Sequence, residues 1–186
     1  MARTYPRIDS ANRMASTPIN ASWIIKNGAI GGVLAGIVFA IAEMIAAFVM
    51  SGKATMPLHM IAGIPLQRPP DQIDDTTAIV VGTLSHMVYA MAAGIIVALL
   101  VALIPALRRS ASATIVFSAA LNLLSWPLNF FVIAPLINAP WFASMTEPTA
   151  MLLQAAWHII FGAILGWYLA SQLPKEVPVE ATRTVQ

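Results

Sequence analysis

The side chains best suited to chemistry are two histidines that open matching segments. Residues 86–94 read HMVYAMAAG and residues 158–166 read HIIFGAILG, each with an aromatic residue three positions and a small residue four positions after the histidine. Both segments lie in long apolar runs. An imidazole in such surroundings either pairs with another polar group or ligates a metal or a haem.

Two further polar side chains are expected at the same depth in the molecule. Each histidine lies about nine residues from the outer start of its predicted helix, roughly 13 Å along the axis. Glu43 and Asn129 lie near the outer ends of the other two predicted helices. We therefore expect Glu43, His86, Asn129 and His158 to form one polar layer.

The composition indicates that these residues belong to an integral membrane protein. The 186-residue chain is 59% hydrophobic and 10% charged, and its mean hydropathy is +0.78. Charged residues are absent from residues 76–107, 110–146 and 148–174, and Glu43 alone interrupts residues 28–50. Each run exceeds the roughly 20 residues that cross a bilayer as a helix. We predict an all-α, four-helix transmembrane bundle with helices near 28–50, 77–104, 112–137 and 149–171.

The segments outside these helices complete the domain organisation. Residues 1–27 are predicted to form a flexible cytoplasmic arm and residues 172–186 a cytoplasmic tail. The outer loop, residues 51–76, contains the apolar segment 56–66, which we expect to lie in the membrane interface or to re-enter the membrane. The predicted transmembrane domain covers residues 28–171.

The distribution of basic residues predicts that both termini are cytoplasmic. The inner ends of the predicted helices are flanked by Arg3, Arg7, Arg13, Lys26, Arg108, Arg109, Lys175 and Arg183, whereas only Lys53 and Arg68 lie on the outer side. This pattern predicts a multi-pass protein of the inner (plasma) membrane. No basic patch with interleaved aromatic residues indicates nucleic-acid binding.

The matching histidine segments also suggest an internal duplication. Their two helices would run in the same direction, as expected for two helical hairpins related by a pseudo-twofold axis along the membrane normal. In the first helix, Gly28, Gly32 and Gly36 form a stripe of small residues suited to close helix contact. This stripe is predicted to support a homodimer.

A first interpretation of the polar layer is a haem site. His86 and His158 would ligate one b-type haem, and Ala90 and Gly162 would let the porphyrin approach the backbone closely. This architecture resembles the membrane-bound b-type cytochromes with four-helix bundles. Each of the two helices carries only one histidine here, so one haem is the maximum.

Other interpretations need no haem. Glu43, His86 and His158 would suit Fe, Zn or Mn as a two-histidine, one-carboxylate site, with Asn129 as an outer partner. Alternatively, the polar side chains pair with one another and bind no cofactor. A proton or quinol site is a further alternative.

The segments GAIGGVLAGIVFA, HMVYAMAAG and HIIFGAILG resemble a broad set of small, uncharacterised four-helix membrane proteins of prokaryotes. In these proteins a His-x-x-aromatic-small pattern recurs in the second and fourth helices. The resemblance covers residues 28–171 and implies the fold without implying an activity.

The remaining sequence features narrow the class of function. The chain has no cysteine, which excludes disulfides, iron–sulfur clusters and thiolate metal sites. It also lacks a nucleophile-base-acid set, a phosphate loop and an HExxH motif, so we do not expect an autonomous hydrolytic enzyme. We expect a membrane subunit of a larger redox complex, contacting lipid and other subunits and transferring electrons. The alternatives are a structural accessory subunit and a proton-coupled carrier of small solutes.

Overall fold

The computed structural model describes residues 19–143 and 146–174, in which every regular element is helical. The elements are α1 (Ala21–Ser51), α2 (Met56–Leu66), the 3-10 turn η1 (Pro70–Gln72), α3 (Asp75–Thr77), the π turn η2 (Ala78–Gly82), α4 (Thr83–Leu103), α5 (Pro105–Arg108), α6 (Ala111–Leu128), the π turn η3 (Asn129–Ile133), α7 (Ala134–Leu136), the 3-10 turn η4 (Pro140–Phe142) and α8 (Pro148–Gln172). The all-α prediction is confirmed. Most of the predicted arm and tail, residues 1–18 and 175–186, lies outside the described residues.

Within residues 19–143 and 146–174, four continuous helical runs are long and apolar enough to cross a membrane. They are Ala21–Ser51, Asp75–Leu103, Ala111–Leu136 and Pro148–Gln172, so α3, η2 and α4 form one run and α6, η3 and α7 another. Large apolar side chains on their outward faces, such as Val49, Leu124 and Leu152, are 69% to 78% exposed. Because such a surface is compatible with lipid rather than water, the chain is a multi-pass membrane protein, as predicted.

The first long helix begins at Ala21 rather than near residue 28. Asn20 caps this helix, because its side chain accepts a hydrogen bond of 2.8 Å from the backbone N–H of Trp23. Inside the first turns, the Asn27 side chain donates to the Trp23 carbonyl at 3.0 Å. These polar side chains form hydrogen bonds with backbone groups of the first turns, so they stabilise the helix here. Residues 21–27 therefore belong to α1 and not to the arm.

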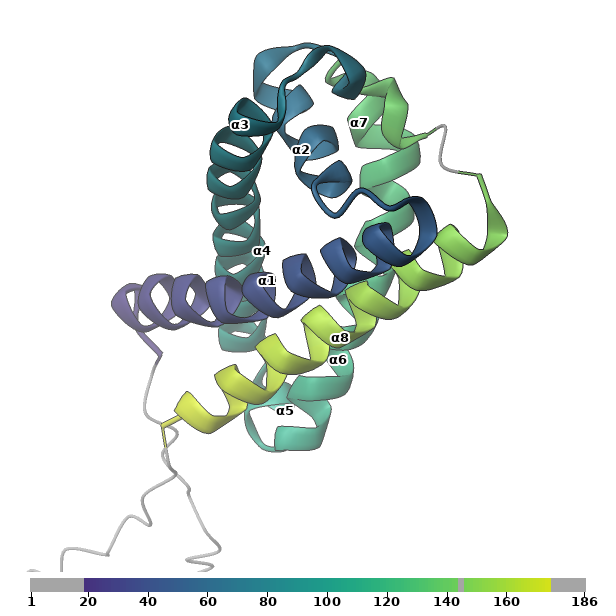
Figure 1. Cartoon of the computed structure of the whole chain (residues 1–186). Coiled ribbons are helices and arrows are strands. Elements are labelled where there is room, and N and C mark those ends of the chain that lie inside the picture. The colour runs from purple at the N-terminus through teal and green to yellow at the C-terminus, as the bar shows by residue number, and fades with distance from the viewer. Residues whose placement is uncertain (1–18, 144–145, 175–186) are drawn as a thin grey trace, which may run out of the picture.

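Glycines bring α1 into backbone contact with α4, which it crosses in Figure 1. A Cβ added to Gly32 would collide with the Ala90 carbonyl group, and one added to Gly94 would collide with the Gly28 carbonyl oxygen. One added to Gly36 would lie 2.6 Å from the Ala90 Cβ. The stripe of Gly28, Gly32 and Gly36, which was expected to serve a homodimer, is therefore covered by α4 of the same chain.

A similar contact joins α8 to α6. A Cβ added to Gly162 would meet the Ser118 carbonyl oxygen, and one added to Gly166 would lie 2.8 Å from the Ile115 Cα. The two helix pairs are linked through α1 and α8, since the Trp23 indole N–H donates to the Gln172 carbonyl at 2.9 Å. The beginning of α1 and the end of α8 thus lie together.

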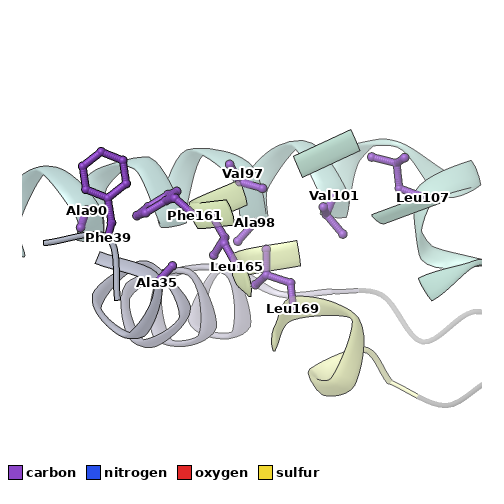
Figure 2. Close-up of a cluster of buried hydrophobic side chains, with 10 residues drawn as sticks. All are labelled: Ala35, Phe39, Ala90, Val97, Ala98, Val101, Leu107, Phe161, Leu165 and Leu169. Carbon is purple, nitrogen blue, oxygen red and sulfur yellow. The ribbon is translucent and has the colours of Figure 1, made fainter. Parts of the chain in front are cut away.

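The main apolar core joins residues of α1, α4, α5 and α8 (Figure 2). Its buried members are Ala35, Phe39, Ala90, Val97, Ala98, Val101, Leu107, Phe161, Leu165 and Leu169. Several are small, which allows the helix backbones to approach closely. Phe39 and Phe161 lie in contact at one end of this core, with ring centroids 6.1 Å apart, and both also border the cavity described next.

Candidate functional site

The long helices surround a cavity of about 690 Å³. Helices α1, α4, α6 and α8 and the turn η3 provide its walls, and Met56, Met60 and Ile61 of α2 also line it. Figure 1 shows α2 in the ring formed by the longer helices. Most of the wall is aliphatic or aromatic. The acid, amide and imidazole side chains among the described lining residues are Glu43, His86, Asn122, Asn129, Gln154 and His158. The structure therefore brings all four members of the predicted polar layer to one cavity.

Glu43 is bound to an amide rather than to a histidine. It is 8% exposed, and the Gln154 Nε2 donates to its Oε1 at 2.7 Å, which connects α1 to α8. The other end of the amide is unsatisfied, because within the described residues no donor reaches the buried Gln154 Oε1. A buried acceptor without a donor costs about 1–3 kcal/mol, and the amide would recover that cost if its side chain turned to meet a donor in the cavity.

Backbone carbonyl groups fix both imidazole rings. The His86 Nε2 lies 2.9 Å from the Gly36 carbonyl oxygen, and the His158 Nδ1 lies 2.8 Å from the Gln154 carbonyl oxygen. A carbonyl oxygen only accepts, so the bonded nitrogen of each ring carries the proton. In the neutral imidazole, the His158 Nε2 is consequently an acceptor.

One haem ligated by both histidines stays a prediction, and the contacts of the two rings describe what surrounds them. The His86 Nε2 is already bound to the Gly36 carbonyl. The Phe39 ring packs against both imidazoles, with centroid distances of 5.8 Å to His86 and 5.0 Å to His158. Each imidazole donates one ring N–H to a carbonyl oxygen, as ligating histidines usually do, and the other nitrogen is Nδ1 in His86 and Nε2 in His158.

The small residues expected to admit a porphyrin contact neighbouring helices instead. Ala90 is 5% exposed, and its carbonyl group lies against Gly32 of α1. Gly162 lies against the Ser118 carbonyl of α6. Both positions need small residues because two helix backbones meet there, so the haem interpretation receives no support from them.

The described residues do not group the three side chains expected to hold a metal ion. Within residues 19–143 and 146–174, no three histidine, aspartate or glutamate side chains are grouped so that they could hold a metal ion. Glu43, His86 and His158 line the same cavity, but Glu43 pairs with Gln154. Asn129, the expected outer partner, is exposed at the start of η3 and borders the cavity.

Gln154 is the functional residue that sequence reasoning left without a role. It precedes His158 by one helical turn, so both side chains lie on the same face of α8. An amide one turn from a buried histidine was the available signal. The choice of Gln154 over either histidine as the partner of Glu43 depends on how α1 and α8 cross.

Helix α2 is anchored at both of its flanks. On one side, the His59 Nε2 lies 2.8 Å from the Asp75 Oδ1 and the His59 Nδ1 lies 3.2 Å from the Pro70 carbonyl oxygen. On the other side, the Trp141 indole N–H donates to the Met60 carbonyl at 3.0 Å. These contacts hold α2 over the cavity.

Carboxyl groups cap the N-terminal ends of two long helical runs. The backbone N–H and the hydroxyl of Thr77 hold the pKa of the Asp74 carboxyl below its usual value. The backbone N–H groups of Ala150 and Thr149 do the same for the pKa of Glu147. Both carboxylates therefore favour their ionised form and stabilise these helix ends.

The cavity wall offers hydrogen-bond acceptors and no positive charge. The Gln154 Oε1 lacks a donor, the Glu43 carboxyl accepts, and neutral His158 presents an accepting Nε2. Neither Lys nor Arg occurs among the described residues that line the cavity. An uncharged molecule with hydroxyl groups and an apolar body matches this wall better than an anion does. No protein-family model, curated protein or solved structure matches this chain.

Proposed function

We propose that this membrane protein binds a lipid-soluble molecule with a hydroxylated ring, of the quinol type, in the cavity between its long helices. The observation that carries the proposal is the surplus of acceptors at Gln154 and Glu43 in an otherwise apolar space. The cavity volume of about 690 Å³ lies in the range typical of small-molecule sites. Aromatic side chains in the wall, including Phe39 and Phe130, offer contacts to a ring.

The same arrangement supports the role expected from the sequence, a subunit of a larger redox complex in the membrane. Oxidation of a quinol releases electrons together with the protons of its hydroxyl groups. Glu43 and His158 would accept hydrogen bonds from those hydroxyls and take up the protons. The two electrons would pass to a metal redox centre of a partner subunit and leave the quinone in the cavity, so this chain would bind and orient the quinol.

The orientation in the membrane belongs to this proposal. Both termini would be cytoplasmic and the cavity would lie in the outer half of the inner membrane, as the basic residues predict. The two hairpins would be a duplication, α1 with α4 and α6 with α8. The glycine contacts within each pair support this view.

Binding of a quinol analogue to the protein in mild detergent tests the proposal. Quenching of tryptophan fluorescence would give the Kd, because Trp157 lines the cavity. Glu43→Gln keeps an acceptor for the Gln154 amide but removes the acid, and Gln154→Met removes the free acceptor. Each should weaken binding about tenfold or more, the effect of losing a hydrogen bond in an apolar site.

A matched control is Thr114→Val in α6. Thr114 is fully buried and donates to the Leu107 carbonyl at 2.7 Å, and it does not line the cavity. This variant changes a buried polar group without changing the site, so its Kd should equal that of the unaltered protein. Absence of quinol binding, or an unchanged Kd in both Glu43→Gln and Gln154→Met, would overturn the proposed function.

A reduced-minus-oxidised absorption spectrum and a metal analysis of the same sample test the haem and metal interpretations. We expect neither a reduced haem band nor a stoichiometric metal, since the proposed quinol site needs no other cofactor in this chain. A sharp reduced band that disappears in both His86→Ala and His158→Ala would replace the quinol by a haem.

A further inference from the structure

A second, wholly apolar hollow lies between α1 and α8 on the lipid-facing side. Its volume is about 370 Å³, and its wall includes Ala42, Ile45, Ala46 and Val49 of α1 with Leu153 and Trp157 of α8. Ile45 and Val49 are 60% and 78% exposed. Since both helices are membrane-length and apolar, this hollow faces the hydrocarbon of the bilayer.

The hollow shares four wall residues with the cavity that contains the polar layer. Ala46, Met50, Leu153 and Trp157 belong to the walls of both. Glu43, the buried acid of the polar layer, directly follows Ala42 in α1. A molecule lying across these shared residues would therefore have one end near Glu43 and the other in lipid.

The opposite end of the cavity is covered by α2. Met56, Met60 and Ile61 form an apolar cover, and the contacts of His59 and Trp141 hold it in place. An apolar molecule arriving from the membrane needs no displacement of α2 if it passes between α1 and α8. Ala42 and Ala46 have the smallest side chains in the wall of the hollow, so the proposed passage lies beside them.

We propose that the ligand is a quinol with a long hydrocarbon chain that enters sideways from the bilayer between α1 and α8. Its hydroxylated ring lies at Glu43 and Gln154, and its chain lies in the hollow beside Ala42. This inference rests on the proposed function and adds the chemical class of the tail and the route of entry. The hollow has no polar side chain apart from the Trp157 indole, so it suits an alkyl or isoprenoid chain.

Two quinols with the same ring test this inference, one with a long chain and one with a short chain. Ala42→Phe fills the hollow without altering the wall of the main cavity. It should weaken binding of the long-chain quinol about tenfold or more, since each methylene group that leaves an apolar contact changes affinity roughly fourfold. Binding of the short-chain quinol should change less than about twofold.

Two comparisons separate this inference from the proposed function. Ile41→Phe adds the same ring to the lipid-facing side of α1, where Ile41 is 54% exposed and lines neither space, and should affect neither quinol. Glu43→Gln should weaken both quinols, because both share the ring. If Ala42→Phe left long-chain binding unchanged, or weakened both quinols equally, the lateral route would be wrong while ring binding stood.

Photo-crosslinking of the unaltered protein provides a second test that does not depend on the folding of a variant. The probe is the long-chain quinol with a photoreactive group at the end of its chain, added in detergent or in vesicles. Crosslinks should appear in residues 42–50 of α1 and residues 153–157 of α8. Crosslinks confined to α2 would place the chain toward the outer surface and overturn the lateral route.

Discussion

The contact between α1 and α4 predicts that two adjacent glycines respond differently to the same substitution. A Cβ at Gly32 would collide with the Ala90 carbonyl oxygen and lie 2.9 Å from its carbon and 3.2 Å from the Gly94 Cα, all backbone atoms. A Cβ at Gly31 would meet side-chain atoms, with the Tyr168 Cδ1 at 2.7 Å and the Leu165 Cδ1 at 3.0 Å. Side chains can shift to relieve such an overlap, whereas helix backbones must separate.

The expected magnitude follows from ordinary contact distances. Carbon atoms in contact lie about 3.5–4.0 Å apart, so Gly32→Ala must move α1 away from α4 by about 1 Å. Forcing a methyl group into a packed interface costs about 1–3 kcal/mol. Both variants share any gain in helix propensity, up to about 1 kcal/mol, so this gain cancels in the comparison. We expect Gly32→Ala to be about 2 kcal/mol less stable than Gly31→Ala.

Reversible unfolding in mixed micelles, followed by tryptophan fluorescence, measures this difference. Gly32→Ala should also loosen the bond between His86 and the Gly36 carbonyl, one turn further along the same contact. If this bond is loosened, Gly32→Ala should bind the quinol more weakly, whereas Gly31→Ala should not. If the two variants unfolded with the same free energy, to within about 0.5 kcal/mol, the close approach of α1 and α4 would be refuted.

Two further predictions concern the contacts that hold α2 and the helix cap at Asp74. His59→Leu removes the bonds of α2 to Asp75 and Pro70. Because the Asp75 side chain is 79% exposed, the loss of stability should be only about 0.5–1 kcal/mol, which corresponds to a two- to fivefold faster hydrogen exchange of the α2 amides. Unchanged exchange would show that other contacts hold α2 in place. The backbone N–H and hydroxyl of Thr77 depress the pKa of Asp74, so this cap stabilises the helix fully above the usual carboxyl pKa of about 4 and loses its effect as the pH falls through the depressed value. Asp74→Asn keeps a capping acceptor that does not titrate, so thermal unfolding in acid should be less pH-dependent than in the unaltered protein, and an identical acid profile would contradict this.

The helical content and the membrane-length runs could be predicted because they depend on local composition. An uninterrupted apolar run longer than the bilayer core must satisfy its backbone hydrogen bonds internally, which makes it helical. The start of α1 was misjudged because the prediction followed the apolar residues, whereas the capping side chain of Asn20 determines the first turn. The π turns η2 and η3 had no distinct sequence signal, since the same residues can form an ordinary α-helix.

The candidate site was predicted only in part. Counting residues from the helix ends brought Glu43, His86, Asn129 and His158 to similar depths, and all four border one cavity. The hydrogen-bond partners of these side chains could not be predicted from residue spacing. Each partner depends on a lateral contact, and a shift of one helix along another changes which polar groups meet.

The sequence by itself determined that this chain is a helical, multi-pass membrane protein with polar side chains inside its membrane-length helices. The length of an apolar run and the spacing of residues along a helix are properties of the chain, so they do not depend on how the helices pack. Only the tertiary structure decided that Gly32 serves α4 rather than a second copy, that Gln154 pairs with Glu43, and that the polar side chains surround a cavity instead of closing on one another. These outcomes depend on the crossing of helices at glycine contacts, where a single methyl group would change the distance between two backbones.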